Sequence, residues 1–155
     1  MNYLEVNKAS WNKRAGEHFN SQFYDNSSFI SGRNSLNDIE LQLLNDINGK
    51  KILHLMCHFG QDSISLARMG ANVTGVDFSE KSIDLANKLK RDCNTNVNFI
   101  CTDVYSLKSI LNDRFDIVYA SYGTIGWLPD IDKWSEIISH YLKPGGHFIF
   151  LPDST

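Results

Sequence analysis

From Lys51 onward, the chain alternates short apolar runs with longer amphipathic segments, and this alternation limits the fold more than any other feature of the sequence. Short apolar runs are typical of buried strands, whereas apolar residues three and four positions apart are typical of helices. Strands that alternate with helices form βαβ units around a parallel sheet, so we expect an α/β fold. The expected strands are residues 51–56, 72–77, 96–103, 114–121 and 145–152. The expected helices are residues 61–70, 79–92, 105–112 and 130–143.

Residues at the segment boundaries indicate where these helices begin and end. Ser79 is a predicted N-cap, and Gly70 is typical of a helix C-terminus. The LKPGG run at 142–146 contains a proline and two glycines, which predict a helix stop and a tight turn. Trp134 lies at helical spacing with other apolar residues, so we expect it in the core.

The first fifty residues are rich in asparagine and serine and differ from the rest of the chain. Their pattern predicts helices around residues 6–19 and across residues 35–47, and Ser35 with Asp38 resembles a capping box at the start of the second helix.

Residues 21–34 lie between these two helices and combine polar with aromatic side chains. Their weak periodicity predicts no regular element, which leaves two interpretations: a lid or wall over a site, or a surface loop with aromatics tucked into the core. We expect residues 1–50 to form a helical cap on residues 51–155, all in a single domain.

Composition narrows the class of ligand. The chain has 155 residues, a formal net charge of −3 and a pI near 5.9, so it has no basic surface to attract nucleic acid or an anionic membrane. No apolar run is long enough to cross a bilayer, and the first residues lack the layout of a secretion signal. We expect a cytoplasmic protein that binds a small molecule.

Cysteine spacing argues against disulfides and metal sites. Cys57, Cys93 and Cys101 are widely spaced, and the chain contains no CxxC motif. His54, Cys57 and His58 are close in sequence, but His54 falls within a predicted strand and no second group of ligands follows. We therefore expect no metal, and a buried, hydrogen-bonded His54.

Polar residues follow the carboxyl ends of four predicted strands. The stretch LMCHFGQD, residues 55–62, follows the first strand, Asp77 closes the second and Asp103 the third, and Ser121 and Tyr122 follow the fourth. In open parallel sheets ligands bind beyond these ends, so these positions should converge on one site.

The first of these loops contains a single glycine, Gly60. A dinucleotide site needs three glycines, because the pyrophosphate approaches bare backbone. Cys57, His58 and Phe59 place side chains there instead, which argues against NAD or FAD.

A ligand with an adenosine and a carboxylate, but no phosphate, suits this loop better. The helix that follows begins near Gln61 and Asp62, where backbone amides can face a carboxylate or a sugar. Asp62 would repel a carboxylate, so we expect it to cap the helix or to bind the ligand's ammonium group.

Asp77 lies seventeen residues after the loop glycine, where an acidic side chain typically binds a ribose diol. Its alternative role is to cap the next helix, which Ser79 can do better. Asp103 is placed to accept a hydrogen bond from an adenine amino group, with Thr102 and Val104 beside it. An alternative role of nearly equal weight is that Asp103 caps the helical segment that follows.

These runs together resemble one family. The stretch ILHLMCHFGQDSISLARMGANVTGVDFSEKSIDLA, followed by FICTDV, FDIVYASYGTIGWLPD and LKPGG, resembles the class I S-adenosylmethionine-dependent methyltransferases, in particular a bacterial branch whose first loop contains CHFG. The resemblance implies a Rossmann-like, doubly wound sheet of order 3-2-1-4-5. It also implies an S-adenosylmethionine cofactor, with Met56–Gly60 under the methionyl part, Asp77 at the ribose, Phe78 against the adenine and Asp103 at its amino group.

The resemblance further implies that Ser121 and Tyr122 flank the sulfonium. Methyl transfer is an in-line displacement that needs alignment more than acid–base chemistry. If the acceptor carries a proton, the candidate bases are Tyr122, Tyr24 and His18, and their spacing does not select one. Trp127 could form a wall of the acceptor pocket.

The chain also departs from the family pattern. Sheets of this family have seven strands, whereas this chain ends at Thr155, just after the fifth. The apolar run HFIFLP, residues 147–152, would then form an exposed edge, so we expect a homo-oligomer or reduced stability.

Three functions follow from this sequence. The first is a methyltransferase with a small-molecule acceptor. The second is a truncated protein that binds S-adenosylmethionine or S-adenosylhomocysteine without catalysis. The third is a nicotinamide-dependent oxidoreductase, which the glycine-poor loop opposes.

Overall fold

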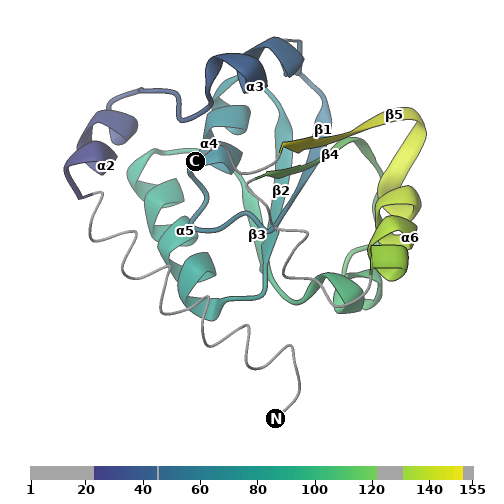
Figure 1. Cartoon of the computed structure of the whole chain (residues 1–155). Helices are drawn as coiled ribbons and strands as arrows, with labels where there is room; N and C mark the ends of the chain where they lie inside the picture. The colour runs from purple at the N-terminus through teal and green to yellow at the C-terminus, as the bar shows by residue number, and fades with distance from the viewer. Residues whose placement is uncertain (1–22, 45, 122–130, 152–155) are drawn as a thin grey trace.

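Five parallel strands form one sheet at the centre of the molecule (Figure 1). The computed structural model describes residues 23–44, 46–121 and 131–151. The strands are β1 (Lys51–Leu55), β2 (Asn72–Asp77), β3 (Asn98–Cys101), β4 (Phe115–Ser121) and β5 (Leu142–Leu151). Their order is β3-β2-β1-β4-β5, and every pairing is parallel, which confirms the predicted doubly wound α/β topology.

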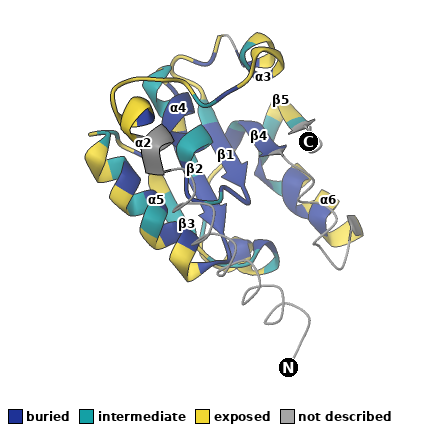
Figure 2. Ribbon diagram, turned by 60° about the vertical axis from the view of Figure 1, so that its left-hand side comes forward, coloured by how far each residue is buried: buried dark blue, intermediate teal, exposed yellow. Residues whose placement is uncertain are grey.

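Helices cover both faces of this sheet, so the central strands β2, β1 and β4 are largely buried between two layers (Figure 2). The helices are α2 (Phe23–Ile30), α3 (Asp38–Leu43), α4 (Gln61–Arg68), α5 (Glu80–Asp92) and α6 (Ile131–Tyr141), with a 3-10 helix, η1 (Val104–Ser109). On one face η1 and α6 pack on the sheet, and Trp134 is buried there as predicted. On the other face residues of α2, α4 and α5 pack together with Leu36 and Leu44, which flank α3. Among the described residues, no helix is both long and apolar enough to span a bilayer.

Local signals place the helices of the βαβ units correctly. Ser79 caps α5 by accepting from the Ser82 N–H at 3.1 Å, as predicted. Gly70 follows the end of α4 with φ 99°, a conformation that favours glycine. The segment expected at 105–112 forms the shorter η1, which Asp103 caps.

The N-terminal part differs from the sequence prediction in two ways. Residues 21–34 were expected to form no regular element, but they include α2. The Arg68 guanidinium holds the end of this helix by donating to the carbonyls of Phe29 at 2.7 Å and Ile30 at 3.1 Å. Phe29 is fully buried in the core, where the second interpretation of this segment placed aromatics.

The capping box of α3 is also not the predicted one. Asn37 and Glu40 form it, because the Asn37 side chain accepts from the Glu40 N–H and the Glu40 side chain accepts from the Asn37 N–H. The helix is accordingly shorter than the expected 35–47. Ser35 cannot cap it, because its hydroxyl bonds to α4 instead.

The LKPGG run is part of β5 rather than only a helix stop. Helix α6 ends at Tyr141, and Leu142 already pairs with Phe115 of β4. The next pair is Ile117 with His147, so residues 143–146 bulge out of the ladder. Gly145, with φ 80°, supplies the conformation that such a bulge requires.

Candidate functional site

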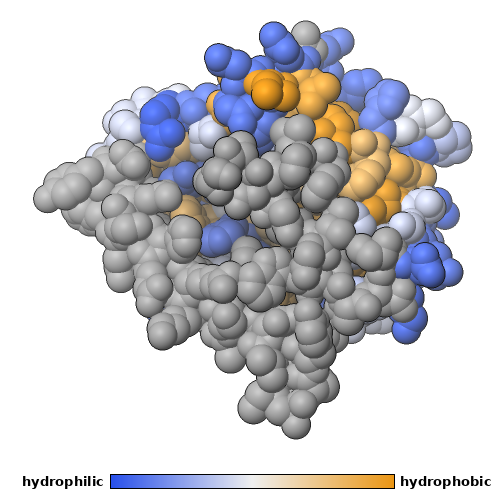
Figure 3. Space-filling view, viewed as in Figure 1, coloured by the Kyte–Doolittle hydropathy of each residue, from blue (hydrophilic) through white to orange (hydrophobic). Residues whose placement is uncertain are grey.

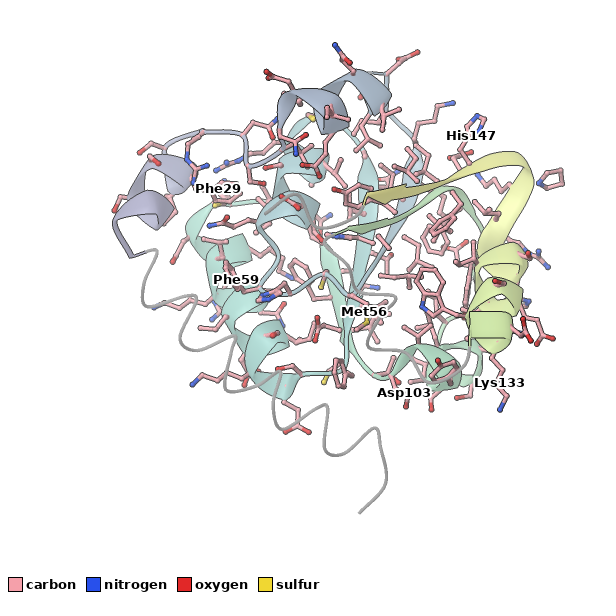
Figure 4. The ribbon with its side chains drawn as sticks, viewed as in Figure 1. Phe29, Met56, Phe59, Asp103, Lys133 and His147 are labelled. Atoms are coloured by element: carbon pink, nitrogen blue, oxygen red, sulfur yellow. The ribbon has the colours of Figure 1, made fainter. Side chains whose placement is uncertain are left out.

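The loop after β1 and the residues that close β2, β3 and β4 lie at one edge of the sheet. This follows from the parallel register, in which Leu55 is paired with Val76 and Asp77 with Cys101. In Figure 4, Met56 lies near the centre and Asp103 lies below it, whereas Phe29 and His147 lie in the upper part. The strand ends therefore converge as the sequence predicts for a ligand site.

The loop after β1 has an unusual backbone. Met56, His58 and Gly60 have φ values of 57°, 61° and 89°, so every second residue is left-handed. For Met56 and His58 this conformation costs about 1 kcal/mol each, because Cβ crowds the following carbonyl. The loop thus follows a path that glycine adopts without strain, with side chains at two of its three left-handed positions.

Most of these loop side chains point into the protein. Met56, Cys57 and Phe59 are buried, and Met56 packs with Phe78 in the core cluster that contains Trp134. These predicted cofactor contacts therefore present little surface to a ligand in this conformation. Gly60 is needed for close packing as well, because a Cβ there would lie 2.7 Å from Phe99 Cζ.

Asp77 connects the loop to the start of α5. Its Oδ2 accepts from the His58 N–H and its Oδ1 from the Ser79 N–H, both at 2.9 Å, and the residue has no exposed surface. Burial, together with the Asp77 charge, raises the pKa of the Cys57 thiol well above its usual range. A protonated thiol neither attacks nor binds metal, and no group of three metal-ligating side chains occurs in the described part of the chain.

The end of β3 is fixed in a similar way. The Thr102 N–H donates to the Asp77 carbonyl at 3.0 Å, and Val104, the first residue of η1, is buried. Asp103 accepts from the Ser106 N–H at 3.0 Å and from the Ser106 hydroxyl at 2.9 Å. The capping role of Asp103 is therefore observed, and its adenine contact stays a prediction.

At the start of α4, Asp62 does not cap the helix. The N-cap residue is Gly60, which has no side chain for that role. Gln61 is the first helical residue, and Asp62 accepts from the Ser35 hydroxyl at 2.6 Å. The predicted ammonium contact of Asp62 is untested.

His54 belongs to a buried polar cluster whose other members, Ser63, Tyr119 and Glu40, the sequence did not indicate. His54 Nδ1 is 2.6 Å from the Ser63 hydroxyl, and its ring lies 4.8 Å from the Tyr119 ring. The Tyr119 hydroxyl donates to the fully buried Glu40. Burial, together with the nearby His58, lowers the pKa of His54 to about 3, so its imidazole is neutral. The prediction of a buried, hydrogen-bonded His54 is confirmed.

The remaining predicted site residues lie outside the described part of the structure. This holds for His18, Tyr122, Trp127 and the side chain of Tyr24. Ser121 closes β4, but its side chain is not described. The choice among the candidate bases therefore stays open.

The geometry above defines a doubly wound α/β protein whose candidate ligand site lies at the strand ends. Residues 52–146 match the family model described as "Methyltransferase domain". This match covers more than half of the chain, so the chain belongs to this methyltransferase domain family. Membership implies S-adenosylmethionine as the cofactor.

Relatives of this chain include proteins named as O-methyltransferases and as N-methyltransferases. The chain is 35% identical over 104 residues to a "Ubiquinone biosynthesis O-methyltransferase" of Coxiella burnetii. The matched stretch makes up 67% of this chain and 44% of the relative. It is 32% identical over 117 residues to "Phosphoethanolamine N-methyltransferase 1" of Triticum aestivum. This matched stretch makes up 74% of this chain and 23% of the wheat protein. The chain thus spans less than half the length of these two relatives.

Solved structures agree with the fold. An S-adenosylmethionine-dependent methyltransferase from Clostridium acetobutylicum has a TM-score of 0.63 at 27% identity, covering 72% of this chain and 46% of that one. A putative methyltransferase from Methanococcus maripaludis has a TM-score of 0.72 at 20% identity, covering 93% of this chain and 65% of that one, and shows the fold alone.

Proposed function

We propose that this protein binds S-adenosylmethionine at the strand ends and transfers its methyl group to a small-molecule acceptor. The observation that carries the proposal is Asp77, a carboxylate at the end of β2 fixed between the loop after β1 and the start of α5. Family membership supports the same cofactor.

Asp77 has the right chemistry to hold the ribose of this cofactor. A carboxylate oxygen is the kind of acceptor that a ribose hydroxyl needs, and Asp77 places one at the end of β2. Because Asp77 is fully buried here, the atoms that cover it must move aside before a ligand reaches it.

Other residues have supporting roles in this proposal. The backbone of Met56–Gly60 lies under the methionyl part, Phe78 beside the adenine and Asp103 near its amino group. When bound, the cofactor would supply an electrophilic methyl group for in-line displacement. The protein's own contribution is then to align the acceptor with that methyl group and to exclude water.

Calorimetry with S-adenosylmethionine, S-adenosylhomocysteine and NAD tests the proposal. We expect the first two to bind and NAD not to bind, because the partly exposed His58 side chain occupies a loop position where a dinucleotide needs bare backbone. Asp77→Asn should weaken binding at least tenfold, and Asp84→Asn, on the exposed face of α5, should not. Equal affinity of the native and Asp77→Asn proteins would contradict the ribose contact.

Catalysis is tested separately from binding. The names of the two relatives include transfer to oxygen and to nitrogen, so the acceptor screen should contain phenols and amines. Methyl transfer to any of them supports an enzyme. Tight binding with no transfer would support the second candidate function, a protein that binds the cofactor without catalysis. This outcome is worth testing because the chain matches only 44% of the length of the Coxiella relative.

A second copy of this chain is the proposed protein partner. Strand β5 pairs only with β4 among the described strands, and Phe148 on it is 38% exposed. Apolar surface over α3 continues toward β5 in Figure 3, and Ile39 and Leu43 of α3 are exposed. An open apolar edge favours pairing with another strand. Light scattering should show a dimer; a monomer at high concentration would contradict this partner.

A further inference from the structure

Ser82, in the first turn of α5, has a buried hydroxyl with no hydrogen-bond partner among the described residues. The residue has no exposed surface. Buried hydroxyls are normally paired, because taking one out of water without a partner destabilises the folded protein. A ligand that supplies the partner would remove this cost. Ser82 is therefore a candidate for a role in binding.

The backbone around Ser82 does not take this hydroxyl. A serine within a helix often donates to the carbonyl four residues earlier, which here is the carbonyl of Phe78. That carbonyl accepts from the Cys101 thiol at 3.9 Å instead. The Ser82 N–H, in contrast, is paired, because it donates to the Ser79 hydroxyl at 3.1 Å. The helix cap thus satisfies the backbone of Ser82 but not its side chain.

Packing places Ser82 between Asp77 and the loop after β1. A Cβ at Gly60 would lie 3.0 Å from the Ala86 Cβ, so the face of α5 that carries Ala86 packs on this loop. Ser82 lies four residues before Ala86, and it is therefore on the same face and one turn nearer the strand ends. Asp77 accepts from the Ser79 N–H, and the Ser79 hydroxyl accepts from the Ser82 N–H. Asp77 and Ser82 are thus each one hydrogen bond from Ser79.

Asp77 and Ser82 have complementary hydrogen-bonding chemistry. The proposed function, on which this inference rests, requires Asp77 to bind a ribose diol. A ribose hydroxyl both donates and accepts, whereas a carboxylate only accepts, so Asp77 leaves the oxygens of the diol without donors. The His58 and Ser79 amides cannot easily fill this role, because they already donate to Asp77. The Ser82 hydroxyl can donate, and no described residue accepts its proton.

We propose that Ser82 is a further cofactor-binding residue, whose hydroxyl donates to a ribose oxygen of S-adenosylmethionine next to Asp77. Both residues are fully buried, so the rearrangement that uncovers Asp77 also gives the ribose access to Ser82. The hydroxyl then destabilises the protein without cofactor and strengthens the complex. A serine with a purely structural role would not affect stability and binding in opposite directions.

Urea unfolding without cofactor tests the effect on stability. Ser82→Ala removes the unpaired hydroxyl, so the equilibrium constant for unfolding should fall roughly 3- to 10-fold. Alanine is also the stronger helix former, and Ser135→Ala, at an exposed position of α6, measures that contribution separately. The gain from Ser82→Ala should exceed the gain from Ser135→Ala. A Ser82→Ala protein that gains no more than this control would show that the hydroxyl is already satisfied, and would overturn the proposal.

A second control compares Ser82 with a buried serine that has partners. Ser65 of α4 is buried, and its Oγ accepts from the Ser35 N–H at 3.0 Å. Ser65→Ala should therefore raise the equilibrium constant for unfolding, in contrast to Ser82→Ala. If both variants were destabilised to the same extent, the two serines would be equivalent and the proposal would be wrong.

Calorimetry with S-adenosylhomocysteine tests the effect on binding. Ser82→Ala should bind this compound roughly 3- to 10-fold more weakly than the native protein, whereas Ser65→Ala and Ser135→Ala should bind it with native affinity. Equal affinity of Ser82→Ala and the native protein would overturn this inference and leave the proposed function in place. A native protein that binds neither S-adenosylmethionine nor S-adenosylhomocysteine would refute both.

Deoxyribose analogues locate the contact on the cofactor. The 2′-deoxy and 3′-deoxy forms of S-adenosylhomocysteine each lack one ribose hydroxyl. If Ser82 donates to one of these hydroxyls, the native and Ser82→Ala proteins should bind the analogue without it equally well, although they differ for the parent compound. The same loss of affinity in Ser82→Ala for all three ligands would place the contact outside the ribose and overturn the proposal.

Discussion

Replacing Asp62 with asparagine is expected to stabilise the protein at high pH and to leave its stability nearly unchanged at pH 4. The folded-state pKa of Asp62 is raised from 3.8 to about 7. Between these values the unfolded chain has lost the proton that the folded protein keeps, so native stability falls as pH rises from about 4 to 7. A pKa difference of this size corresponds to a loss of about 4 kcal/mol in the free energy of unfolding at high pH. Asp62 is partly exposed to solvent, which reduces this loss to roughly 2–4 kcal/mol.

The contribution of His54 to stability increases with pH, whereas that of Asp62 decreases. The Asp62→Asn variant must therefore be compared with the native protein at each pH. The pKa of His54 is lowered from 6.5 to about 3, and its stabilising contribution is present above pH 6.5 and lost as pH falls toward 3. This contribution is common to both proteins and cancels in their difference.

Urea or thermal unfolding at pH 4, 6 and 8.5 measures that difference. At pH 8.5 the asparagine variant should be more stable by roughly 2–4 kcal/mol, or about 5–15 °C in Tm. The Asp84→Asn control should follow the native protein throughout. A variant of equal or lower stability at pH 8.5, or a difference that does not change with pH, would refute the reasoning.

Three further changes test other parts of the structure. Tyr119→Phe removes a donor from the buried Glu40 carboxylate and should lower the free energy of unfolding by about 1–3 kcal/mol, measured with urea at pH 7; an unchanged value would show that this bond contributes nothing. Arg68→Ala removes the donor to the Phe29 carbonyl and the guanidinium 4.6 Å from the Phe29 ring, so limited proteolysis should cut near α2 several times faster; native-like resistance would argue against this anchor. His58→Gly should be more stable than His58→Ala by about 1 kcal/mol in thermal unfolding, because φ 61° strains any residue with a Cβ; equal stabilities would contradict the left-handed backbone.

Much of the fold could be predicted from the sequence because its signals are local. Runs such as Ile52–Leu55 have apolar residues on both faces, and only a sheet covered on both sides buries them. Ser79 needs only the amide three residues later to cap α5. These contacts are close in sequence, so pattern and propensity are sufficient to locate them.

The features that the sequence did not reveal depend on contacts that are distant in sequence. Ser35 is 27 residues from Asp62, to which its hydroxyl donates, and Asn37 rather than Ser35 caps α3. Glu40 and Tyr119 are 79 residues apart, and neither side chain signals the other. The end of helix α2 accepts hydrogen bonds from Arg68, which no local pattern in residues 21–34 indicates.

The candidate site was predicted in its position but not in its detail. Parallel strands bring Asp77 and the loop after β1 together, which topology alone predicts. The burial of Asp77 and the left-handed backbone at Met56 and His58 come from the folded structure. Sequence reasoning counted the missing glycines but had no means to see that the loop keeps a glycine-like path.

A titration of the isotope-labelled native protein with S-adenosylmethionine, followed by amide resonances, tests the central claim most directly. The His58 and Ser79 amides donate to the two oxygens of Asp77, so they report on that carboxylate without any mutation. If the cofactor binds at the strand ends, both resonances should shift and saturate, and NAD at the same concentration should leave them unchanged. Resonances that stay in place at millimolar S-adenosylmethionine would contradict the claim.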